Sequence, residues 1–165
     1  MCNRFDRTIL SRLTLAAGLF LGFGQAAQAA NPFTPFAGLW SGGGEIVASG
    51  GSHEKISCKA KYSGTSSQDA LHTNVRCASD SYKVHILIDV QAQGSSFTGT
   101  WQETTRQASG DVSGRIPAKG QLQASLSGVG FGIQLSASSN GRQQAISIQS
   151  QNTDVETVTI TLRKN

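Results

Sequence analysis

The chain has 165 residues, of which 15% are charged, and its formal net charge is +4 at pH 7. This length fits one domain, and so weak a basic balance does not indicate a nucleic-acid-binding protein. Three arginines and one aspartate lie in the first twelve residues, so the remainder of the chain carries a net charge of only +2.

The N-terminal segment has the three parts of a secretory signal peptide. A basic start is followed by an apolar run over residues 13–23 and by the small-x-small sequence Ala27-Gln28-Ala29. We therefore expect residues 1–29 to be removed by cleavage after Ala29, which makes the protein periplasmic or secreted. The apolar run is too short to span a bilayer, and no later segment is long and apolar enough, so we expect no membrane span.

A short strap should follow at residues 30–36, because this stretch holds two of the three prolines. Its aromatic residues, Phe33 and Phe36, allow two interpretations. They either anchor the strap in the cleft of a partner protein, or they plug the end of this protein's own domain.

Residues 37–165 repeat one pattern, in which short runs of alternating apolar and polar residues are separated by turn-forming residues every 8 to 12 positions. That spacing is typical of an all-β domain. It predicts ten strands, at 38–49, 54–63, 70–79, 82–92, 95–104, 110–117, 120–127, 131–138, 142–150 and 155–163. Because the connections are short, the fold class should be an antiparallel up-and-down barrel, with a two-sheet β-sandwich as the alternative.

Turn chemistry gives a register for the predicted hairpins. We place two-residue turns at Asp80-Ser81, Gln93-Gly94 and Asn140-Gly141. With two further choices, Ile46 opposite Ile56 and Cys58 opposite Cys77, the predicted pairs are Cys77–Val84, Val90–Phe97, Leu135–Ile146, Trp40–Tyr62 and Tyr62–Thr73. All of them keep the apolar residues from Trp40 to Leu162 on one inner face.

Two cysteines, Cys58 and Cys77, remain after the signal peptide. In an exported chain such a pair most simply forms one disulfide bond. The chosen register places it on the inner face between neighbouring strands.

Charged side chains fall mostly on the outer face, which leaves the interior without groups for acid–base chemistry. They are Lys59, Lys61, Arg76, Lys83, Asp89, Arg106, Arg115 and Arg163. An enzyme would have to gather Glu54, Glu103 or Asp154 at a barrel mouth, and nothing in the sequence gathers them, so we expect no enzyme.

The histidines offer no metal site in this register. His72 should face Asp89, and His85 should face Arg76, on the outer surface. We interpret them as solvated histidines and expect no metal and no cofactor.

The candidate site is the barrel interior. The residues assigned to it are Trp40, Tyr62, Ile86, Ile88, Trp101 and Phe131. Small residues such as Gly99, Gly114 and Ala124 lie in the wall between them. Either the aromatic rings fill the space over the small residues and make a solid core, or the small residues leave a cavity for an apolar ligand.

Short motifs give the chain two resemblances to known proteins. Gly38-Leu39-Trp40 and Gly99-Thr100-Trp101 resemble the G-x-W signature of the calycin barrels, the lipocalins and avidins. In lipocalins a basic residue near the last strand packs over the first tryptophan, and Arg163 is the arginine placed to match, although its position points outward. Phe36 to Gly42 and Leu71 to Tyr82 also resemble small exported Gram-negative bacterial proteins of unassigned function.

These observations predict a non-enzymatic exported barrel whose interior binds a small apolar ligand. The alternative is an envelope protein-interaction module, or an inhibitor, that uses the N-terminal strap. The expected partners are accordingly a small hydrophobic molecule or an envelope protein.

Overall fold

A computed structural model describes residues 31–64 and 69–165 of the protein, and the predicted signal peptide lies outside them. The chain forms ten antiparallel strands, and each differs from its predicted range by no more than two residues at either end. Their bounds are β1 Gly38–Ala48, β2 His53–Ser63, β3 Ala70–Ala78, β4 Lys83–Gln93, β5 Ser96–Glu103, β6 Ala108–Arg115, β7 Gln121–Gly128, β8 Phe131–Ser139, β9 Gln143–Gln151 and β10 Val155–Lys164.

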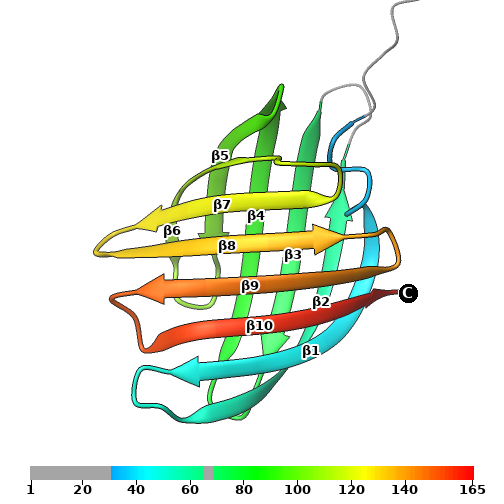
Figure 1. Ribbon diagram of the computed structural model, residues 1–165. Coiled ribbons are helices and arrows are strands. Elements are labelled where there is room, and N and C mark those ends of the chain that lie inside the picture. The colour runs from blue at the N-terminus through cyan, green and yellow to red at the C-terminus, as the bar shows by residue number, and fades with distance from the viewer. Residues whose placement is uncertain (1–30, 65–68) are drawn as a thin grey trace, which may run out of the picture.

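The strands form a closed barrel in which each pairs with the next in sequence and β1 pairs with β10. In Figure 1, strands β7–β10 cross β2–β5 at a steep angle, as expected for a strongly coiled sheet. The barrel prediction is therefore confirmed, and the two-sheet sandwich is wrong. The described part of the chain holds no helix with the length and hydropathy needed to cross a membrane.

Glycines in β1 allow the ring to close. The backbone of β1 passes so near that of β10 that a Cβ atom built on Gly44 would lie 1.7 Å from the Thr159 carbonyl oxygen. A Cβ atom on Gly42 would lie 2.1 Å from the carbonyl oxygen of Thr161. Only glycine permits such an approach between neighbouring strands.

The predicted inner face is confirmed by burial. Ile160 and Leu162 near the end of the chain are 8% and 1% exposed. The predicted disulfide joins Cys58 to Cys77 on this face. The charged residues that we assigned to the outer face are all exposed.

Two of the predicted registers are correct. Cys58 lies opposite Cys77 and Tyr62 opposite Thr73 in the β2–β3 pair. Cys77 lies opposite Val84 in the β3–β4 pair, as the turn at Asp80-Ser81 requires.

Three other predicted registers are wrong by two residues. Val90 faces Gly99 rather than Phe97, because the two-residue turn is Gly94-Ser95 with Gly94 at a positive φ of 63°. A turn with glycine in its first central position is one of the two favoured hairpin types.

The hairpin between β8 and β9 differs because Asn140 does not adopt the positive φ that a type I′ turn needs. Its side-chain Oδ1 instead accepts hydrogen bonds from the backbone N–H groups of Arg142 and Gln143, at 2.9 and 2.8 Å. Four residues therefore lie between the paired Ser139 and Gln144, and Leu135 faces Ile148 instead of Ile146.

The first hairpin turns through Gly51, whose φ is 78°, and pairs Ile46 with Glu54 instead of Ile56. Trp40 consequently lies opposite Ala60, and Tyr62 lies opposite Gly38. A shift of two residues moves side chains along the barrel without exchanging the faces, so the inner face survives all three errors.

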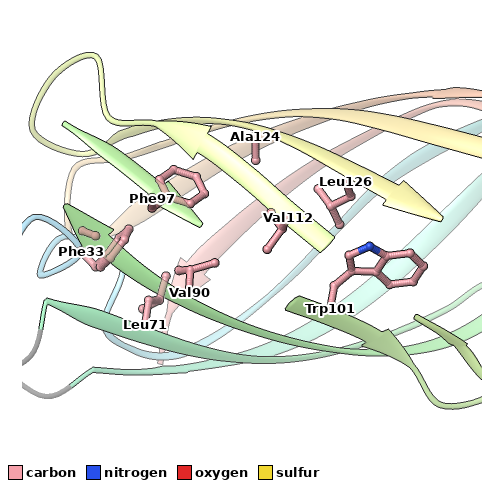
Figure 2. Packing of buried hydrophobic residues seen from close by; sticks show 9 residues of the cluster. Phe33, Leu71, Val90, Phe97, Trp101, Val112, Ala124 and Leu126 are labelled. Atoms are coloured by element: carbon pink, nitrogen blue, oxygen red, sulfur yellow. The ribbon is translucent and has the colours of Figure 1, made fainter. Parts of the chain in front are cut away.

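The interior contains two hydrophobic clusters. The first includes Phe33, Phe97 and Trp101, and Figure 2 shows Phe33 beside Phe97 at one side of it with Trp101 at the other. The second surrounds Trp40 and the disulfide. Tyr62 packs against both clusters and therefore lies between them.

Substitution of Gly44 by Ala should destabilise the barrel strongly, because the new methyl group would collide with the β10 backbone. We expect a loss of at least about 2–3 kcal/mol in the free energy of unfolding, measured by urea denaturation. Gly132→Ala is the matched control, since a Cβ atom there meets nothing within 4 Å. Equal stabilities of the two variants would contradict the close β1–β10 approach.

Candidate functional site

The strap closes one end of the barrel, which we call the strap end. Phe33 and Phe36 are 1% and 2% exposed, and Phe33 packs edge-on against Phe97 with ring centroids 5.9 Å apart. Ser139 Oγ donates a hydrogen bond of 2.6 Å to the Pro35 carbonyl oxygen. In Figure 1 the strap lies at one end of the barrel, next to the start of β1. Of the two interpretations of the strap, the plug matches this packing.

Trp40 helps to hold the strap at this end of the barrel. It is 1% exposed, and its indole N–H donates a hydrogen bond of 2.7 Å to the Phe36 carbonyl oxygen. Lys164 lies over its ring, with Nζ 5.5 Å from the centroid, within the range of a cation–π contact. Arg163, the arginine considered for that position, is exposed on the outer face. Gly38, with a φ of 124°, leaves the space that the Lys164 side chain occupies.

Aromatic rings cover the glycines of β6 and β7. A Cβ atom on Gly114 would lie 2.3 Å from the Phe97 ring, and one on Gly128 would lie 2.4 Å from the Phe131 ring. Trp101 packs against Phe131 with centroids 5.8 Å apart and donates a 3.0 Å hydrogen bond to the Ser127 carbonyl oxygen. On this side of the interior the aromatic rings therefore lie in the space over the glycines, as the solid-core interpretation expects.

The other side of the interior is packed less completely. Ile86 and Ile88 on β4 point inward but keep partly accessible surface. So do Ile146 and Ile148 on β9. In the ring of ten strands β4 and β9 lie five positions apart, which places them on opposite walls. Ile88 packs against the first cluster and Ile146 against the second, whereas Ile86 and Ile148 belong to neither.

Tyr62 is another inward residue that is only partly buried, and it carries a hydroxyl group. Burial raises the pKa of its phenol to about 12. The residue nevertheless keeps partly accessible surface. The two observations agree if that surface faces space inside the barrel rather than bulk water.

The six predicted site residues thus divide into two groups. Trp40 and Trp101 are buried, at 1% and 5% exposure, and both indole N–H groups are bonded to backbone carbonyls. Tyr62, Ile86, Ile88 and Phe131 keep accessible surface. The structure also adds Ile146 and Ile148 to the candidate site. The sequence pattern had placed both on the inner face, but we had not assigned them to the site.

At the far end, opposite the strap, the Glu103 carboxylate is hydrogen-bonded to the turn that follows β5. Its carboxylate accepts hydrogen bonds from the backbone N–H groups of His85, Thr105 and Arg106, and from the Thr105 hydroxyl. Desolvation is the largest single influence on it and favours the neutral form. The hydrogen bonds together outweigh desolvation and lower the pKa from 4.5 to about 2.

The remaining titratable candidates are also held in turns or on the surface. Glu54 accepts a 3.1 Å hydrogen bond from the Ser81 N–H, and hydrogen bonds from Ser81 and Ser79 lower its pKa. His72 pairs with the exposed Asp89 at 2.5 Å, at the position the register predicted. Among residues 31–64 and 69–165, no three His, Cys, Asp or Glu side chains gather as metal ligands.

A hollow of about 670 Å³ lies outside the barrel, over β5–β9. Its lining consists mainly of outward-pointing hydroxyl and amide side chains such as Ser113, Gln134 and Ser147. A second hollow of about 460 Å³ adjoins it and shares Gln123, Ser136 and Ser147. None of the six predicted residues lines either hollow. The outward Ser, Thr and Gln residues of β7–β10 were the sequence signal for this polar face, which Arg115 of β6 also lines.

Replacing Phe33 by Ala should destabilise the protein by about 3–5 kcal/mol, because it removes a fully buried ring from the strap end. Thermal denaturation would measure this loss. Leu39→Ala, at a residue 54% exposed, is the control and should change stability little. An unchanged melting temperature for the Phe33 variant would show that the strap does not plug the barrel.

Glu103 should make the free energy of unfolding depend on pH in the acidic range. Since its folded pKa is lowered, its contribution is complete above about pH 4.5 and is lost as the pH falls toward 2. Glu103→Gln should cost about 1–2 kcal/mol at pH 7 and flatten the stability profile between these pH values. Urea denaturation at several pH values tests this, with the exposed Glu156→Gln as control. If the unfolding free energy of Glu103→Gln depended on pH as steeply as that of the wild type, the lowered pKa of Glu103 would be refuted.

Comparison with known proteins supports the fold. No family model matches the chain, and no curated protein matches its sequence. The crystal structure of Rv2717c from M. tuberculosis is similar, with a TM-score of 0.63 and 8% sequence identity over 81% of this chain and 94% of that chain. At this identity the similarity shows a shared barrel architecture and nothing about activity.

Proposed function

We propose that the protein is a non-enzymatic exported barrel that binds a small apolar molecule in its interior, between the β4 and β9 walls. The observation that carries this proposal is the pair of facing isoleucine rows, Ile86 with Ile88 and Ile146 with Ile148. All four residues have inward register positions and are only partly buried, and Ile146 also lines the second outer hollow. In a solid core of this size, the central side chains of opposite walls would cover one another.

The chemistry of these walls supports an apolar ligand. Covering hydrocarbon surface contributes about 25 cal/mol per Å². The walls present isoleucine and valine, with Val75, Val84 and Val158 also partly accessible. A molecule with a hydrocarbon body would therefore gain most of its affinity from contact with them.

Export is supported by two independent features. The disulfide bond between Cys58 and Cys77 is consistent with an exported protein, because such bonds persist in oxidising compartments. The predicted signal peptide points the same way. Together they favour a periplasmic or secreted location.

A binding role agrees better than catalysis with the acidic residues at the far end. General acid–base catalysis needs a titratable group whose pKa lies near the working pH. Glu103 and Glu54 have lowered pKa values and hold turns through their hydrogen bonds. Asp154, the third acidic candidate, is exposed in the loop before β10.

The interaction-module alternative would require the strap to leave the barrel. Phe33 and Phe36 are its only aromatic anchors, and both are buried in the strap end. Releasing them would expose two rings and break the bonds to the Phe36 carbonyl oxygen. We therefore favour the interior as the site.

Binding can be measured with the fluorescent apolar probe N-phenyl-1-naphthylamine. We expect saturable binding to the delipidated protein. Ile148→Trp should reduce the affinity for the probe at least about tenfold, because the indole would occupy the space between the walls. It should cost less stability than the 1–3 kcal/mol typical of overpacking a filled core.

Ser147→Trp is the matched control, because Ser147 neighbours Ile148 on β9 but is exposed in the outer hollow. It should leave probe binding unchanged. Loss of binding in the Ser147 variant alone would move the site to the outer surface. Absence of saturable binding to the wild-type protein would refute the proposal.

A further inference from the structure

The polar groups inside the barrel are few, and one of them stands out. Tyr62 lies on β2 between the two hydrophobic clusters, directly opposite Thr73 on β3. Thr73 in turn lies opposite Ile88, one of the partly accessible wall residues. The two hydroxyl-bearing residues therefore neighbour each other and the inward face of β4.

Neither hydroxyl is bonded to another residue that the structure describes. Within the described part of the chain, the side chains of Tyr62 and Thr73 form no hydrogen bond. The indole N–H groups of both tryptophans, by contrast, are bonded to carbonyl oxygens at 2.7 and 3.0 Å. Buried polar groups are normally paired, so two neighbouring unpaired hydroxyls call for a partner.

Thr73 is 8% exposed and Tyr62 is partly buried, but their hydroxyl oxygens are not fully enclosed. Among the described residues, the one fully enclosed side-chain atom without a partner is Gln144 Oε1 at the strap end. The hydroxyl oxygens of Tyr62 and Thr73 are therefore not enclosed. Because its pKa is raised to about 12, the Tyr62 phenol stays protonated and can donate a hydrogen bond at any physiological pH.

The surroundings favour a neutral partner over an ionised one. The isoleucine and valine side chains beside the two hydroxyls cannot compensate a charge. Lys164 has an inward register position, but it is exposed and lies over the Trp40 ring. A carboxylate beside Tyr62 would lose its hydration without gaining a counter-ion, which strongly disfavours its binding.

We propose that the interior ligand is amphipathic, with an apolar body between β4 and β9 and a neutral oxygen group, an alcohol or a ketone, that binds the hydroxyls of Tyr62 and Thr73. This inference rests on the proposed function and names its substrate class. Tyr62 is then the residue that selects ligands by their head group. The preference would be absent in a barrel that binds hydrocarbon alone.

Displacement of N-phenyl-1-naphthylamine tests the inference, with decan-1-ol, decan-2-one and decanoate as competitors of equal chain length. The wild-type protein should bind the alcohol and the ketone at least about tenfold more tightly than decanoate. Tyr62→Phe removes only the hydroxyl and should weaken both neutral competitors about fivefold to tenfold, the size of one hydrogen bond. The affinity for the probe itself should stay within about twofold.

Tyr82→Phe is the matched control, since it is the other tyrosine of the chain and packs only against the second cluster. It should not change the competition. The melting temperature of the ligand-free Tyr62→Phe protein should be unchanged or higher, because an unpaired hydroxyl has been removed. A lowered melting temperature would indicate a structural bond instead and would contradict the inference.

The outcomes separate the two proposals. Probe binding that is equal for the wild type and Tyr62→Phe, with unchanged displacement by decan-1-ol, would overturn the head-group inference and leave interior binding intact. Tighter displacement by decanoate would also overturn it. Failure of the wild-type protein to bind the probe would overturn both.

Discussion

Backbone hydrogen bonds between β1 and β10 join the two edges of the sheet, and this pairing gives the molecule an inside. The two strands approach so closely that glycine is required at positions 42 and 44 of β1. Once the ring is closed, the alternation of each strand sends one set of side chains to a common interior. The disulfide, the two hydrophobic clusters and the candidate site all depend on that closure.

The interior that results is filled unevenly. Phe97, Trp101 and Phe131 lie over glycines of β6 and β7 and fill that side. The strap fills one end with Phe33 and Phe36. The inward isoleucines of β4 and β9 are only partly buried, and we propose that the ligand binds between them, near the hydroxyl groups of β2 and β3. Uncovered hydrocarbon walls with a small polar patch are typical of sites for small amphipathic molecules.

The sequence predicts the parts of this structure that depend on alternation. The period-two pattern identifies the ten strands and the inner face, and it is compatible with the choice of Cys58 opposite Cys77. The turns at positions 93–95 and 140–143 cannot be resolved in this way, because a shift of two residues leaves every side chain on the same face. Those registers depend on the backbone conformations of Gly94 and Asn140, which composition does not determine.

The candidate site is predictable only in part, for a related reason. Alternation shows that Trp40 and Ile86 both point inward, but it does not show which of them is covered. That depends on distances across the barrel, between strands that are far apart in sequence. The Tyr62 hydroxyl is a similar case, because its lack of a partner becomes evident only when the neighbouring strands are in place.

The central claim is that the β4 and β9 walls do not meet. Diffraction from crystals pressurised with xenon tests it most directly, since xenon occupies dry apolar cavities in proteins. We predict xenon density between Ile86 and Ile148, inside the barrel. Absence of xenon there, with the isoleucines of the two walls in van der Waals contact, would contradict this claim.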